Sequence, residues 1–195
     1  MILNPTIADI WRPCEKSQAS LYNVWLVLGG SLFIALSAQI SFGYPVPFTM
    51  QTFAVLLVGA LFGPKMGSLS VGLYLLEGLA GWPVFSHWRS GFHMLLGPTG
   101  GYLVGFLIAA YVTGFLAQKG WDRGFFSTFL AMFAGNVIIY TIGILQLSFL
   151  FGVRQALVVG LYPFIAGAVI KIALAAALLP TGWKLMGYCG FLKSR

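Results

Sequence analysis

Charged residues are scarce in this chain. They make up 8% of its 195 residues, and only four of them are aspartate or glutamate, whereas hydrophobic residues make up 59%. A soluble protein of this composition would lack the polar surface that a folded domain presents to water. The composition therefore excludes a soluble protein and predicts a single-domain integral membrane protein.

Side chains that could catalyse a reaction inside a membrane are rarer still. Glu77 is the only acidic residue within a hydrophobic run, and neither histidine lies within one. An intramembrane enzyme would need paired carboxylates, a metal cluster or an activated nucleophile. The sequence therefore predicts neither an enzyme nor a cofactor. His87 and His93 are interpreted as interfacial residues, because no cysteine or carboxylate accompanies them.

Cysteine is also rare, and Cys14 and Cys189 lie near opposite ends of the sequence. This spacing predicts free thiols on a reducing side. The formal net charge is +7, but the basic residues form no run or patch, so nucleic acid is not an expected partner. The segment 97–101 lacks the Lys-Ser/Thr ending of a phosphate-binding loop, so the chain itself is not expected to hydrolyse ATP. No signal peptide is expected, because charges precede the first long hydrophobic run.

Long hydrophobic runs, by contrast, are abundant and predict an all-α protein with six transmembrane helices. The predicted spans are 21–40, 49–62, 66–81, 97–118, 125–147 and 164–179, the last ending at Pro180. They divide the chain into an interfacial N-terminal segment at 1–20, a transmembrane domain at 21–182 and a tail at 183–195. A short interfacial helix is possible within the first of these.

The second and third spans are predicted to fold back on each other at Gly63-Pro64-Lys65, since glycine frees the backbone and proline removes an N–H. Both are shorter than the roughly 17 residues needed to cross the hydrocarbon core. We therefore expect a bowl, because irregular backbone at that depth must be buried in protein or line a wet cavity. Its rim would be the proline-rich loop 45–47 and the aromatic connection 82–98, which is predicted to form an interfacial lid. The connection 148–162 allows a short surface helix.

Basic residues predict the orientation. All of them fall on the side of the two termini, apart from Arg89, Arg154 and the intramembrane Lys171. Because cytoplasmic segments carry the excess of lysine and arginine, both termini are expected in the cytoplasm. The protein is then a multi-pass protein of the cytoplasmic membrane whose bowl opens to the outside.

Five motifs in this order resemble the BioY family: PVPFTMQT, GALFGPKMG, YLLEGLAGWPVF, GPTGGYLVGF and GNVIIY. That family comprises the biotin-specific substrate-capture (S) components of energy-coupling-factor (ECF) vitamin transporters. The resemblance covers about residues 30–180. It implies a six-helix S-component fold and high-affinity capture and uptake of biotin. The implied partners are a transmembrane coupling subunit and two ATPases that hydrolyse ATP, although some members are reported to act alone. A carrier or channel for another small vitamin-like solute is the alternative.

The chain departs from the family pattern in its last span. Members commonly have Pro-Phe-Ile-Pro-Gly-Asp followed by a lysine three residues later, whereas this chain has Ala166 and Ala168 in place of the second proline and the aspartate. Lys171 is retained. Either another group supplies the polar contact of the aspartate, or affinity or specificity differs in this chain. Glu77 or Asn136 is expected to replace the aspartate in part.

The predicted binding residues are polar groups within or next to the spans. Thr49 or Gln51 is expected to hydrogen-bond the neutral ureido group of the ligand, with helix capping as the alternative for Thr49. At least two of Tyr74, Glu77, Asn136 and Tyr140 are expected at the same end of the ligand. Asn136 and Tyr140 are four residues apart and share a helix face, and hydrogen bonding between helices is the alternative for all four.

Lys171 is expected to bind the carboxylate of the ligand roughly 10 Å below the rim. The alternatives are that it snorkels to the outer surface or pairs with Glu77. On the first span, Ser31, Ala35 and Ala38 form a face of small residues that lets another helix approach closely. The resemblance implies that this face contacts the coupling subunit, and packing within the chain is the alternative.

Overall fold

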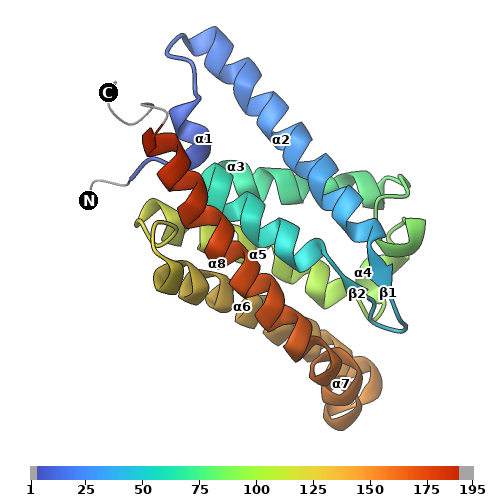
Figure 1. The fold of residues 1–195 in the computed structure, drawn as a ribbon. Coiled ribbons are helices and arrows are strands. Elements are labelled where there is room, and N and C mark those ends of the chain that lie inside the picture. The colour runs from blue at the N-terminus through green and yellow to red at the C-terminus, as the bar shows by residue number, and fades with distance from the viewer. Residues whose placement is uncertain (1–3, 189–195) are drawn as a thin grey trace.

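The computed structural model describes residues 4–188, and most of these form helices (Figure 1). Five helical stretches are long and apolar enough to cross a membrane, the last of them running from Val153 to Gly187. The elements in chain order are α1 (Ile7–Ile10), α2 (Lys16–Gln39), β1 (Ser41–Phe42), β2 (Phe48–Thr49), α3 (Gln51–Leu79), the 3₁₀ turn η1 (Ser86–Trp88), α4 (His93–Leu96), α5 (Gly100–Gln118), α6 (Phe125–Phe151), α7 (Val153–Gly160), the 3₁₀ turn η2 (Tyr162–Phe164) and α8 (Ile165–Tyr188).

Helix α3 is bent back on itself at Gly63. This glycine has φ 79° and ψ 176°, outside the helical region, and Pro64 follows it. The Gln51 amide donates a hydrogen bond to the Tyr74 hydroxyl at 2.6 Å, and a Cβ on Gly67 would lie 2.8 Å from the Gly59 Cα. Both pairs are centred on the bend, so the two arms of α3 run antiparallel and in contact, as the predicted turn at 63–65 requires.

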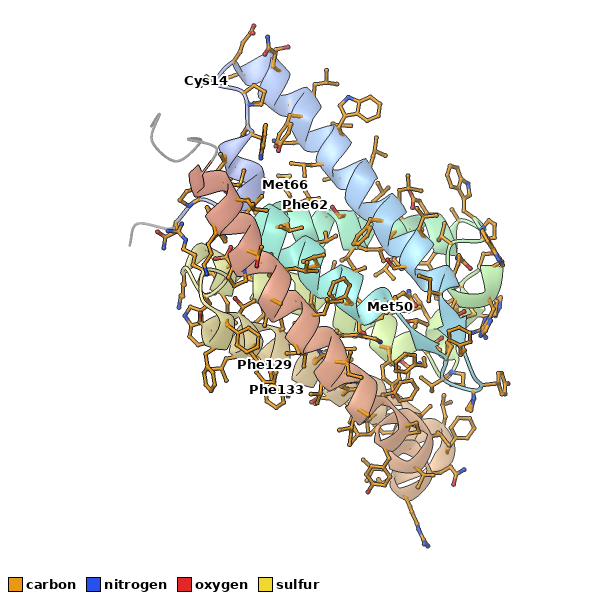
Figure 2. All side chains as sticks on the ribbon, in the orientation of Figure 1. Cys14, Met50, Phe62, Met66, Phe129 and Phe133 are labelled. Carbon is orange, nitrogen blue, oxygen red and sulfur yellow. The ribbon has the colours of Figure 1, made fainter. Side chains whose placement is uncertain are left out.

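The bend in α3 lies near α1, at one end of the molecule. Figure 2 places Phe62 and Met66, which flank the bend, close to α1, whereas Met50 lies toward the end that carries β1 and β2. The last turns of α8 are also at the α1 end, and α4 and α7 are at the opposite end (Figure 1). The segment before α2 is fixed there by two hydrogen bonds: Asn4 N–H to the Gln118 carbonyl, and the Tyr22 hydroxyl to the Ala8 carbonyl.

Helix α5 lies at the centre of the packing, between α3 and α6. A Cβ on Gly114 would come within 2.5 Å of the Pro64 nitrogen, so this glycine is needed for the close approach of α5 to the bend. Small residues at such positions let membrane helices gain van der Waals contact.

The predicted end of the last helix is wrong. Helix α8 continues through Pro180 to Tyr188, because neighbouring groups compensate for the proline. The Thr181 hydroxyl donates to the Ala177 carbonyl at 2.7 Å, and the Trp183 indole N–H donates to Asp122 Oδ2 at 2.5 Å. The first bond lies within α8, and the second attaches its final turns to the connection between α5 and α6. The tail predicted at 183–195 therefore begins within a helix, and residues 189–195 lie outside the described part of the chain.

Candidate functional site

A cavity lies where α3, α5, α6 and α8 meet the connections at the β1–β2 end. It contains about 530 Å³ of space not filled by atoms, part of which is open to solvent. Its lining is mostly apolar and aromatic, with a few neutral polar groups and one cation. The lining residues are Val46, Pro47, Thr49, Gln51, Thr52, Phe85, Ser86, Met94, Thr99, Tyr102, Leu103, Phe106, Tyr140, Phe164 and Lys171.

Lys171 is the cation. It is 7% exposed, and its Nζ donates to the Thr49 carbonyl at 2.5 Å and to Thr52 Oγ1 at 3.2 Å. The ammonium also lies 4.1 Å from the centre of the Phe48 ring. Within residues 4–188 it makes no ion pair, and the Glu77 carboxylate instead accepts a hydrogen bond from Ser31. The positive charge of Lys171 is therefore solvated by neutral groups, and an anion in the cavity would meet it directly.

Thr49 and Gln51 both line the cavity, as expected of rim residues. The Thr49 hydroxyl accepts the backbone N–H of Gln51 at 3.3 Å, next to Met50, which is the N-cap of α3. The Gln51 side chain is held by its bond to Tyr74. Its amide is therefore oriented before any ligand arrives.

An aromatic wall completes the cavity. The rings of Tyr102 and Tyr140 are 6.3 Å apart, those of Tyr140 and Phe164 are 6.4 Å apart, and Phe164 stacks on Phe48 at 6.0 Å. The Tyr102 hydroxyl donates to the Gly160 carbonyl and fixes that ring. The sequence indicated Tyr140 alone. Phe48 and Tyr102 each belong to one of the five motifs and lie where a strand or a helix begins. That position in a motif could have indicated them as site residues.

Three predicted binding residues do not line the cavity. Tyr74 is fully buried between the arms of α3, Glu77 joins the second arm to α2 through Ser31, and Asn136 donates to the Met132 carbonyl of its own helix. In the described structure these side chains contact other parts of the protein, and their contact with the ligand stays a prediction. Hydrogen bonding between helical segments, the alternative, describes Tyr74 and Glu77.

Asn136 instead borders a separate apolar groove between α6 and α8, which also contains Ala168. Its Oδ1 atom is buried without a hydrogen-bond partner. The position of the missing aspartate therefore faces this groove. Asn136 also lines a small pocket that it shares with Lys171, and partial replacement of the aspartate by Asn136 or Glu77 stays a prediction.

The small-residue face of α2 packs against α3. Ser31, Ala35 and Ala38 are all buried within the chain. A Cβ on the neighbouring Gly30 would touch Ser70 and Phe62 of α3. This burial favours the alternative of packing within the chain, and contact with a coupling subunit stays a prediction.

The connection 82–98 contributes Phe85, Ser86 and Met94 to the cavity. It covers one side of the site, as a lid would, and is attached to the end of α2 through Gln39. His87 lies 3.4 Å from the Ser41 hydroxyl. Among residues 4–188, no three histidine, cysteine or acidic side chains are grouped in a way that could hold a metal ion.

Comparisons with known proteins agree with one another. The sequence model of the BioY family matches residues 15–188. The chain is 39% identical over 163 residues to the biotin transporter BioY of Thermotoga maritima, covering 83% of this chain and 90% of that protein. It is 37% identical over 154 residues to the biotin transporter BioY of Rhizobium etli, covering 74% and 82%. The crystal structure of the S-component for biotin from an ECF-type ABC transporter superposes with a TM-score of 0.77 at 27% identity, covering 88% of this chain and 95% of that one.

Proposed function

Because this chain belongs to the BioY family, we propose that it captures biotin with high affinity at the outer face of the cytoplasmic membrane and carries it inward. Transport involves no catalytic step and no cofactor of its own. A transmembrane coupling subunit and two ATPases are the proposed partners, since the structurally similar S-component belongs to an ECF-type transporter. Action without these partners is the second possibility.

The observation that carries this proposal is the single cation in the lining of the cavity. Lys171 is buried among neutral acceptors, and the rest of the lining is aromatic, aliphatic or neutral and polar. Biotin has one carboxylate, a neutral ureido group and an apolar bicycle with an aliphatic tail. The cavity offers one partner for the charge, amide and hydroxyl groups for the ureido group, and rings for the bicycle.

The proposed membrane arrangement has six crossings, two of them made by the arms of α3, with both termini in the cytoplasm. Its support is the distribution of basic residues. Lys65 at the α3 bend and Lys119 and Arg123 between α5 and α6 all belong to the α1 end of the molecule. By the positive-inside rule this end faces the cytoplasm, and the cavity opens outward.

The direct test is equilibrium binding of radiolabelled biotin to the purified, detergent-solubilised protein. We expect saturable binding at one site, with no competition from vitamin-like acids that lack the ureido ring, such as lipoate. If biotin does not bind and another small solute does, the alternative of a different vitamin carrier replaces this proposal.

The partner assignment is tested separately, by purifying tagged protein from its native membrane. Recovery of a second membrane protein together with two ATPases would support the ECF arrangement. Recovery of the chain alone, from cells that still take up biotin through it, would support solitary action.

A further inference from the structure

The turn from Phe85 to Arg89, at the edge of the cavity, has an unusual backbone. His87 has φ 59° and Trp88 has φ 56°, both in the left-handed region although neither is glycine. Residues keep such conformations only where the surrounding structure imposes them, and they are concentrated at functional sites. We therefore expect this turn to hold a side chain in a defined position at the cavity.

Two side chains hold this turn in place. The Gln39 amide donates to the carbonyls of Val84 and Phe85 and accepts the backbone N–H of Trp88 at 3.1 Å. From the other side, Arg89 Nε donates to the Ser86 carbonyl at 3.1 Å, and Arg89 Nη2 donates to Ser86 Oγ at 3.2 Å. The backbone N–H of Phe85 closes the turn on the Arg89 carbonyl at 3.0 Å.

The result of these contacts is a fixed Ser86 hydroxyl at the wall of the cavity. Ser86 is 4% exposed and lines the cavity. A guanidinium group has only donors, so Ser86 Oγ accepts from Arg89 and its own proton remains available. No residue in the described part of the chain accepts that proton. A hydroxyl whose oxygen is already bonded to a cation is a strengthened donor.

Ser86 lies on the same side of the cavity as Gln51. The Phe85 ring contacts the Tyr74 ring edge-to-face at 5.5 Å, and the Tyr74 hydroxyl binds the Gln51 amide. Lys171 instead donates to Thr49 and Thr52, on either side of Gln51 in the sequence, and lies against the Phe48 ring. Ser86 makes no hydrogen bond with Lys171 in the described part of the chain, so the cavity offers the Ser86 hydroxyl as a donor apart from the cation.

We propose that the Ser86 hydroxyl donates a hydrogen bond to the ureido oxygen of the bound ligand, with Arg89 and Gln39 as positioning residues behind it. This assignment rests on the proposed function. The carboxylate of the ligand is then left to Lys171.

The test compares the Ser86→Ala variant with the parent protein on three ligands. These are biotin, its methyl ester, and the analogue in which sulfur, a weak acceptor, replaces the ureido oxygen. We expect Ser86→Ala to weaken the binding of biotin and of its methyl ester by about 5- to 10-fold each. Binding of the thione analogue should weaken by about twofold or less.

Two results would overturn the assignment. Equal losses for all three ligands would mean that Ser86 acts only through the shape of the loop. A loss that disappears with the methyl ester would place Ser86 at the carboxylate. If the parent protein binds none of the three, the proposed function itself is refuted.

The role of Arg89 is tested with Arg89→Lys, which keeps the charge but not the fork that reaches two atoms of Ser86. We expect it to weaken biotin by about as much as Ser86→Ala, and the double variant to be no weaker than the single ones. If the losses in biotin affinity of the two single variants multiply in the double variant, Arg89 does not act through Ser86. Ser90→Ala, in the same connection but outside the cavity lining, is the matched control and should bind all three ligands as the parent does.

Discussion

At the scale of single residues, Lys171 limits what the cavity can accept. A lysine at the centre of a membrane helix costs about 2.5–3.5 kcal/mol on insertion scales. Here the charge is met by a backbone carbonyl, a hydroxyl and a ring face. A carboxylate would make a stronger, charge-assisted bond than any of these neutral groups. Charge, more than shape, is therefore expected to select the ligand at this point.

The Lys171→Met variant tests this selection. We expect it to weaken biotin by about 10- to 100-fold, the range of a hydrogen bond to a charged group, and to change binding of the neutral methyl ester far less. Titration calorimetry on both ligands measures the difference. Lys65→Met, at the bend of α3 and away from the cavity, is the matched control. Equal losses for acid and ester would place the carboxylate elsewhere.

Part of the site could be predicted residue by residue. Tyr74 and Glu77 do not line the cavity, and the reason is physical. Thr49, Gln51, Tyr140 and Lys171 are polar groups in or beside apolar runs, and all four line the cavity. Tyr74 and Glu77 gave the same signal. A polar group in a membrane needs a partner, but the sequence does not tell whether that partner is a ligand or another helix. Ser86 gave no signal, because its position depends on contacts from Gln39 and Arg89.

At the scale of elements, the β1–β2 hairpin forms part of the rim. Its loop places Val46 and Pro47 in the cavity wall, and Phe48 lies against both Lys171 and Phe164. Strands of two residues are too short to leave a pattern in the sequence, which predicted only a loop. Like the 82–98 connection, the hairpin is joined to the end of α2, since the Met50 N–H donates to the Ile40 carbonyl.

We expect the hairpin to close over the ligand. In a background with both native cysteines replaced by serine, maleimide labelling of Val46→Cys should slow several-fold when biotin is added. Tyr44→Cys, at the tip of the same loop and 85% exposed in the parent, should label at an unchanged rate. Equal rates for Val46→Cys with and without biotin would exclude the hairpin as a lid.

The end of α8 is a second element whose stability can be tested. Burial raises the pKa of the Asp122 carboxyl, and the hydrogen bonds from Trp183 and the backbone, together with Arg123, partly offset this. A raised pKa in the folded state means that stability is lost as pH rises through that pKa. The Trp183 bond limits this loss by stabilising the charged form.

Trp183→Phe keeps a ring beneath Arg123, which lies 4.6 Å from the Trp183 ring, but removes the donor to Asp122. We expect this variant to lose about 1–3 kcal/mol of folding stability at pH 8. The loss of stability should be smaller at pH 4, where the carboxyl is more protonated. The measure is the fraction of protein that stays monodisperse after heating in detergent. Trp121→Phe, on the same connection, is the control. A loss that does not depend on pH would show that packing alone accounts for it.

The positions of the long helices could be predicted closely, because each is encoded by a hydrophobic run that ends at glycine, proline or charged residues. The predicted span 125–147 begins at the same residue as α6, and the predicted span 97–118 ends at the same residue as α5. The end of α8 could not be predicted, because Pro180 is a strong local signal that the bond between Trp183 and Asp122 overrides. A contact between residues this far apart in the chain cannot be predicted from the local sequence pattern.

At the scale of the whole molecule, function is divided between two ends. The α1 end carries Cys14, an exposed free thiol (Figure 2), and most of the basic residues. The other end carries the cavity, the hairpin and the 82–98 connection. Under the proposed function, this division would let the ligand site and a coupling partner act from opposite sides of the membrane.

Thiol accessibility tests the orientation. In spheroplasts, a membrane-impermeant maleimide should label Tyr44→Cys in a background without the native cysteines. It should label Cys14, in the Cys189→Ser background, only after the membrane is permeabilised. Labelling of Cys14 from outside would reverse the orientation and place the cavity in the cytoplasm.

The bend at Gly63 has a consequence for how the protein is made. At about 1.5 Å per residue, the first arm of α3 is roughly 18 Å long and the second roughly 24 Å, against a hydrocarbon core of about 30 Å. Neither arm is therefore long enough to be inserted on its own by the machinery that recognises transmembrane segments. We therefore expect the two arms to insert together as a hairpin, in which Gln51 and Tyr74 can satisfy each other as they do in the folded protein. The turn at Gly63 would then matter for biogenesis as well as for the finished structure.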